Sequence, residues 1–156
     1  MRTAYEENRR YFRRAYETGC HGWESSEPSP HVARNLTIVA SSIAGRRLLD
    51  LGCGEGRHCL LAARIGFLPT GVDYEPRALV RAQASAHQAG LGGRVRWVAA
   101  DVFALPLAPG SFDVVVDYSA FHSPRPAPRT IRRHEMRPRT PATAGRLFHS
   151  PPAASL

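Results

Sequence analysis

An apolar run that leads into three alternating glycines, LLDLGCGEGRH at residues 48–58, constrains the fold more than any other part of the chain. Gly52, Gly54 and Gly56 favour a sharp turn, because glycine adopts positive φ angles at low cost. A glycine turn between a strand and a helix lets the backbone approach a ligand, and the first N–H groups of the helix can face an anion. The run therefore predicts a ligand site on a strand, a turn and a helix, with an ordinary strand-to-helix turn as the alternative.

Short apolar runs and helical patterns alternate from residue 46 onward, which is typical of a parallel sheet covered by helices. Strands are predicted at 46–52, 68–73, 94–100 and 112–119. Helices are predicted near 57–65 and 75–89, with Leu60, Leu61 and Ile65 of the first and Leu79, Ala82 and Ala86 of the second facing the sheet. The predicted fold class is α/β, a Rossmann-like doubly wound parallel sheet.

Two helices are predicted before the first strand, at 3–17 and 31–44, separated by a turn-rich segment at 19–30. The apolar face of the first helix carries three aromatic residues, Tyr5, Phe12 and Tyr16. Trp23 is the large apolar residue of the turn-rich segment, and it suits either core packing or closure over a ligand.

The position of the third glycine separates two kinds of cofactor. The dinucleotide fingerprint G-x-G-x-x-G requires glycine at position 57, where the chain has Arg57. A G-x-G-x-G turn preceded by an aspartate instead resembles the first motif of class I S-adenosylmethionine-dependent methyltransferases. The resemblance implies that this turn holds the methionine and ribose parts of the cofactor. The residues it assigns to this contact are Asp50, Gly52, Cys53, Gly54 and Gly56.

Two further carboxylates follow the next two predicted strands. Asp73 ends the second strand and Asp101 follows the third. They match the family's acids that bind the ribose hydroxyls and the adenine amino group, and the resemblance places Tyr74 and the Val102 N–H beside the cofactor. Either aspartate alone suits a helix N-cap. Acidic residues at three successive strand ends instead favour a binding site.

The fourth predicted strand continues into FDVVVDYSAFH at residues 112–122, which resembles the family's fourth motif. The resemblance places Asp117 near the cofactor and makes Tyr118 and His122 candidate catalytic residues on the acceptor side. A structural role for Tyr118 and a surface role for His122 are the alternatives. No metal is required by this chemistry, and no metal-ligand spacing is present.

The family pattern covers roughly residues 36–122, whereas complete members continue to a seven-stranded sheet. Residues 123–156 contain seven prolines and predict no stable element. The chain is therefore interpreted as the N-terminal half of the fold, truncated or frameshifted after about residue 122. Its predicted parts are N-terminal helices and a cap loop at 1–45, a cofactor-binding core at 46–122 and an irregular tail at 123–156. Loss of the fifth strand would leave the fourth as an exposed edge, which predicts self-association.

The formal net charge of +8 raises a rival interpretation, a nucleic-acid-binding protein. Much of the excess lies in the tail, where seven arginines face one acid, Glu135. These arginines are interrupted by prolines and carry no aromatic interleaving, so no specific nucleic acid is predicted as a partner. No apolar stretch is long enough to cross a bilayer, so no membrane partner is predicted, and three unpaired cysteines suit a cytoplasmic protein.

The predicted function is S-adenosylmethionine-dependent methyl transfer to an unidentified small-molecule acceptor. The positioning of two reactants would supply most of the rate acceleration, because the cofactor is already activated. A non-catalytic remnant that binds the cofactor weakly or not at all is the second alternative beside nucleic-acid binding.

Overall fold

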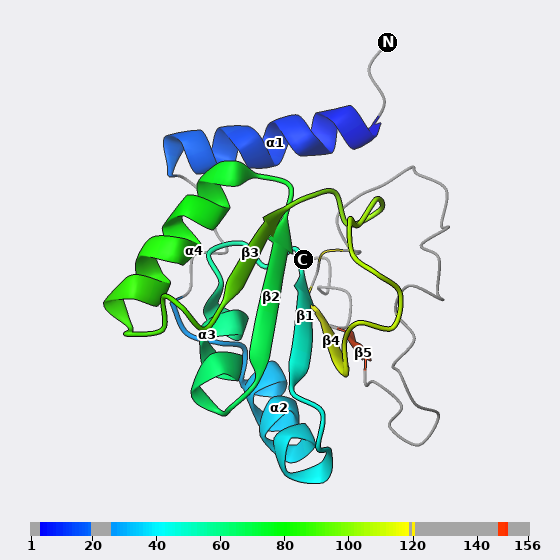
Figure 1. Ribbon diagram of the computed structural model, residues 1–156. Helices are drawn as coiled ribbons and strands as arrows, with labels where there is room; N and C mark the ends of the chain where they lie inside the picture. The colour runs from blue at the N-terminus through cyan, green and yellow to red at the C-terminus, as the bar shows by residue number, and fades with distance from the viewer. Residues whose placement is uncertain (1–3, 20–25, 119, 121–146, 150–156) are drawn as a thin grey trace.

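A computed structural model gives the structure of residues 4–19, 26–118, 120 and 147–149 (Figure 1). The helices are α1 (Ala4–Thr18), α2 (Pro30–Ser42), α3 (Arg57–Arg64) and α4 (Pro76–Gln88). The strands are β1 (Arg47–Leu51), β2 (Leu68–Asp73), β3 (Arg96–Ala99), β4 (Val114–Asp117) and β5 (Leu147–His149). The first four strands and all four helices lie where the sequence predicts them, with ends that agree to within two residues, because helix and strand ends depend on capping more than on periodicity.

The strands form one parallel sheet in the order β3-β2-β1-β4-β5. In the centre, Asp50 of β1 lies in register with Gly71 of β2 and with Val116 of β4. All parallel strands end at the same edge, so the segments that follow β1, β2, β3 and β4 meet there. The predicted α/β fold with a parallel sheet is confirmed.

The two faces of the sheet bury different layers, because successive side chains of a strand point to opposite sides. Leu48 of β1 packs with residues of α2 and α3. Leu49 and Leu51 point to the other face, where they pack with Val115. Helices α2, α3 and α4 lie on the first face. Within the described residues, the second face is covered by the segment after β3, which contributes Phe103 and other apolar residues.

The buried face of α3 differs from the prediction. The sequence predicts Leu60, Leu61 and Ile65 against the sheet, but all three are only partly buried. The buried residues of the helix are His58, Cys59, Ala62 and Ala63. Small side chains face the sheet because α3 packs closely on it, and the larger leucines fill the space beside α2 and α4. For α4 the prediction is confirmed, since Leu79, Ala82 and Ala86 are buried.

Strand β5 corrects a second prediction, that residues 123–156 contain no stable element. Leu147, Phe148 and His149 pair in parallel with Val115, Val116 and Asp117 of β4. The backbone of β4 therefore has a neighbour on both sides, and all four of its residues are buried. β4 is not the exposed edge that the sequence predicts.

Helix α1 lies across the edge where the strands end, above β2 and β3 in Figure 1. It ends at Gly19, whose φ of 66° stops the helix. Trp23 and His122 lie outside the described residues. Among the helices of the described part, none is long and apolar enough to cross a membrane.

Candidate cofactor site

The turn after β1 has the backbone that its glycines predict. Gly52, Gly54 and Gly56 have φ angles of 63°, 54° and 83°. Gly56 is the N-cap of α3, so the free N–H groups of that helix begin directly after the turn. The Cys53 N–H donates to the Val72 carbonyl of β2 at 2.9 Å, which ties the turn to the end of the neighbouring strand.

Asp73, at the end of β2, is the residue that joins the turn to the start of α4. Its Oδ2 accepts the Gly54 N–H and its Oδ1 accepts the Glu75 N–H, each at 2.9 Å. Burial raises the pKa of Asp73, while these two N–H groups act in the opposite direction. The Tyr74 N–H acts on the carboxylate in the same sense, and because two carboxylate oxygens have about four acceptor sites, the group can still accept a further donor such as a hydroxyl. Tyr74 follows directly, and the hydroxyl of Tyr74 is buried without a hydrogen-bond partner in the described part of the chain.

Asp101 lies two residues beyond β3, beside the same edge. Its Oδ1 accepts the Phe103 N–H at 2.9 Å, and its Oδ2 accepts the Tyr5 hydroxyl of α1. Val102, between the two, is 9% exposed and packs in the layer on the second face of the sheet. The structure thus brings the glycine turn, Asp73 and Asp101 to one edge, as the sequence predicts.

Asp50 and Cys59 lie behind the turn, and Cys53 belongs to the turn. Asp50 is 1% exposed, and the Cys59 thiol contacts its Oδ2 at 3.4 Å. Burial, with a smaller contribution from the negative charges of Asp73 and Asp117, raises the pKa of Asp50 to about 7. Burial also raises the pKa of Cys53 to about 11, so this thiol stays protonated. Asp50 and Cys59 therefore support the turn from within the core.

The segment after β4 closes the site on its other side. Asp117 is 1% exposed, and its Oδ1 accepts the Ala120 N–H at 3.1 Å. A Cβ built on Gly52 would lie 2.8 Å from Cβ of Ala120, so only glycine leaves room for this segment. Tyr118 packs edge-on against the ring of His58, with 5.1 Å between the ring centroids, and the Arg57 guanidinium lies 5.5 Å from the Tyr118 ring centroid.

His58, which the sequence does not single out, is 4% exposed. Its Nε2 accepts the Ser29 N–H at 3.2 Å, so the ring proton is carried on Nδ1. Burial, and to a lesser extent the charge of Arg57, lower the pKa of His58 to about 4. His58 is therefore neutral at pH 7 and links the start of α2 to the end of β4.

Comparison with known proteins identifies the family. Residues 48–137 match the family model described as a methyltransferase domain, which is more than half of the chain. This chain belongs to the class I methyltransferase family. The match runs beyond residue 122, where the sequence predicts that the family pattern ends.

Three similar proteins are considerably longer than this chain. The chain is 32% identical to 27-O-demethylrifamycin SV methyltransferase from Amycolatopsis mediterranei, over 62% of this chain and 36% of that protein. It is 30% identical to 2-heptyl-1-hydroxyquinolin-4(1H)-one methyltransferase from Mycobacteroides abscessus, over 65% of this chain and 43% of that protein.

A solved structure concerned with the conversion of a disulfide bond into a thioacetal group during echinomycin biosynthesis superimposes with a TM-score of 0.62 and 27% identity. The superposition covers 72% of this chain and 47% of that one. The methyltransferase chain thus spans less than half the length of each of these three proteins.

Helix α1 adds residues to the candidate site that the sequence does not predict there. The Tyr5 hydroxyl bonds to Asp101, and a Cβ on Gly54 would lie 3.1 Å from the Tyr16 hydroxyl. The aromatic face of the helix is visible in the sequence as a periodic pattern. That pattern indicates that the aromatic side of the helix packs against the rest of the protein, but it does not indicate which residues it packs against.

Proposed function

We propose that this chain binds S-adenosylmethionine at the edge formed by the ends of β1, β2 and β3 and transfers its methyl group to a small-molecule acceptor. The observation that carries the proposal is Asp73, whose buried carboxylate lies at the end of β2 and is bonded to Gly54 of the positive-φ turn. The names of two similar enzymes, which act on a demethylrifamycin and on a hydroxyquinolinone, support a small organic acceptor.

The groups at the edge suit the three parts of this cofactor. The Asp73 carboxylate suits the two ribose hydroxyls, and the Asp101 carboxylate suits the adenine amino group. The N-terminus of α3, directly after Gly56, suits the methionine carboxylate. When bound, S-adenosylmethionine supplies a methyl group on a sulfonium that needs no further activation.

The segment after β4 is the proposed acceptor side. Tyr118 is partly exposed there and is held by the ring of His58 and the guanidinium of Arg57. We assign Tyr118 to acceptor orientation, because alignment of the acceptor atom with the methyl group lowers the barrier of a displacement reaction. His58 acts through Tyr118, since it is buried and bonded to the Ser29 N–H.

Calorimetric titration with S-adenosylhomocysteine tests the cofactor site. We expect wild-type chain to bind and Asp73→Asn to lose roughly 1.5–3 kcal/mol of binding free energy, because a charged acceptor of two hydroxyls is removed. Asp113→Asn is the matched control, since Asp113 lies at the opposite end of the sheet, where it pairs with Arg47. Equal affinity of Asp73→Asn and wild type would refute the ribose assignment.

A further inference from the structure

The first half of α1 covers the two groups that would contact the adenine ring. The Tyr5 hydroxyl donates to Asp101 Oδ2, and the Tyr5 ring packs edge-on against Phe103, with 6.4 Å between centroids. The other oxygen of Asp101 already accepts the Phe103 N–H. Each carboxylate oxygen of Asp101 therefore accepts one bond from the protein, and an adenine amino group bound at Oδ2 would have to share this oxygen with the Tyr5 hydroxyl or replace that hydroxyl.

Tyr74 is the residue after Asp73, to which we assign the ribose hydroxyls. The ring of Tyr74 contacts the same helix, α1. The Arg9 guanidinium lies 5.2 Å from the Tyr74 ring centroid and 5.8 Å from that of Tyr5. Phe12 packs edge-on against Tyr74 at a centroid distance of 6.2 Å. A purine ring that stacked on the face of Tyr74 beneath Arg9 would replace the contact with the guanidinium.

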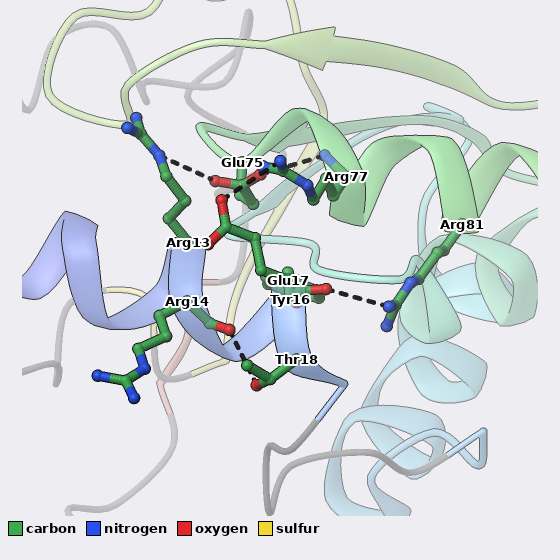
Figure 2. Close-up of polar contacts among 8 residues, drawn as sticks. All are labelled: Arg13, Arg14, Tyr16, Glu17, Thr18, Glu75, Arg77 and Arg81. Atoms are coloured by element: carbon green, nitrogen blue, oxygen red, sulfur yellow. Dashed lines mark hydrogen bonds and ion pairs between the residues drawn. The ribbon is translucent and has the colours of Figure 1, made fainter.

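The second half of α1 is attached to α4 by a different set of contacts, which Figure 2 shows. Glu17 pairs with Arg77 at 3.3 Å, and Arg13 pairs with Glu75 at 3.9 Å. Arg81 donates to the Tyr16 carbonyl at 3.1 Å. These contacts do not involve Tyr5 or Arg9, so the first turns of α1 can unwind without breaking them.

We propose that α1 is a self-occluding cap, in which Tyr5 and Arg9 occupy the adenine side of the site until the cofactor displaces them. The inference rests on the proposed function, because it assigns Asp101 and Tyr74 to the adenine ring. When the cofactor displaces the first half of α1, the contacts of Tyr5 and Arg9 with Asp101 and Tyr74 are lost. The ion pairs between the second half of α1 and α4 stay in place. The apparent affinity for the cofactor is then reduced by the fraction of molecules whose cap is closed.

Removal of the Tyr5 hydroxyl tests the cap. Tyr5→Phe keeps the ring that packs on Phe103 and deletes only the bond to Asp101. We expect S-adenosylhomocysteine to bind this variant about tenfold more tightly than wild type, because a competing bond to a charged acceptor is lost. Tyr11→Phe is the matched control, since Tyr11 lies on the same helix with 60% of its side chain exposed. Its affinity should equal that of wild type.

Hydrogen exchange of the full chain gives a second measurement. At saturating S-adenosylhomocysteine, amides of residues 5–10 should exchange faster than in the free protein, while those of residues 13–18 should be unchanged. Slower exchange of residues 5–10 would overturn the inference, because α1 would then close on the cofactor rather than leave it.

The affinities separate the two proposals. Equal or weaker binding by Tyr5→Phe overturns the cap and leaves the cofactor assignment in place. If neither wild type nor Tyr5→Phe binds S-adenosylhomocysteine, the proposed function fails and the cap fails with it. Binding by Tyr5→Phe alone supports both.

Discussion

Two buried ionisable residues beside the glycine turn should make stability depend on pH in opposite directions. Asp50 lies in β1 and His58 is the second residue of α3, and both are almost fully buried. Burial disfavours the charged form of each group, which raises the pKa of the acid and lowers the pKa of the base. Between pH 4 and 7 the two residues change the free energy of unfolding in opposite directions, so their effects partly cancel in wild type. Each effect must therefore be measured with a variant that removes one of the two groups.

Asp50→Asn should increase the free energy of unfolding relative to wild type as the pH rises. The pKa of Asp50 is about 7 in the folded chain, above its ordinary 3.8. The stability that its protonated form contributes is thus present below about pH 4 and lost as the pH rises through 7. The free energy of unfolding of Asp50→Asn, relative to that of wild type, should rise by on the order of 4 kcal/mol between pH 4 and 8. Urea titrations at several pH values measure it, and a constant difference would contradict the prediction.

His58→Gln should lose less of its free energy of unfolding than wild type does when the pH is lowered. The pKa of His58 falls from 6.5 to about 4 on folding, so the stability of its neutral form is present above pH 6.5 and lost as the pH falls through 4. Wild type should lose about 3 kcal/mol relative to the variant over this range. Thermal unfolding at pH 7 and pH 4.5 compares the two chains. Parallel pH curves would show that His58 is already exposed to protons in the folded state.

At the scale of elements, one aromatic ring supports the glycine turn from β3. The Trp97 indole lies against two glycines: a Cβ on Gly56 would be 2.4 Å from it, and a Cβ on Gly71 of β2 would be 2.7 Å from it. Gly71 lies within a strand and has no positive φ, so its requirement is space and not backbone freedom. The packing of β3 on β2 thus limits what position 71 can hold.

Gly71→Ala should destabilise the fold by about 1–3 kcal/mol, because the added methyl overlaps the Trp97 ring. Trp97→Leu in the same chain should recover part of this loss, since the smaller side chain vacates the overlap. Gly93→Ala is the matched control, because a Cβ there would meet nothing within 4 Å. Urea unfolding of Gly71→Ala, Trp97→Leu, the double variant and Gly93→Ala measures the coupling. Additive losses from the two substitutions would show that Trp97 does not limit position 71.

At the scale of the whole molecule, β5 determines whether the sheet has an exposed edge at β4. Its three residues pair with Val115, Val116 and Asp117 of a fully buried strand. A chain without this pairing would present free N–H and C=O groups beside apolar side chains, which is a template for strand pairing between molecules.

A chain that ends at residue 146 should therefore self-associate, whereas a chain that ends at residue 149 keeps β5 and is the matched control. Sedimentation velocity at several concentrations should show a rising sedimentation coefficient for the shorter chain alone. Its affinity for S-adenosylhomocysteine should be unchanged, because the proposed contacts lie upstream of β5. Two chains that sediment alike would show that β5 does not protect β4.

The sequence alone determines the parts of this protein that depend on neighbouring residues. The first four strands, the helices and the glycine turn were predictable because periodicity and positive-φ glycines act within a few residues. Asp50, Asp73 and Asp101 were placed near the end of a strand for the same reason, and a parallel sheet then brings those ends to one edge. The cofactor role of each residue remains a prediction.

Tertiary structure decides what depends on distant segments. Tyr5 meets Asp101 across 96 positions of sequence, and β5 meets β4 from a region with no pattern of its own. The small residues of α3 face the sheet, although its leucines are the more apolar. In each case the partner is chosen by how whole elements dock, and docking depends on shape and burial that no local window of sequence contains.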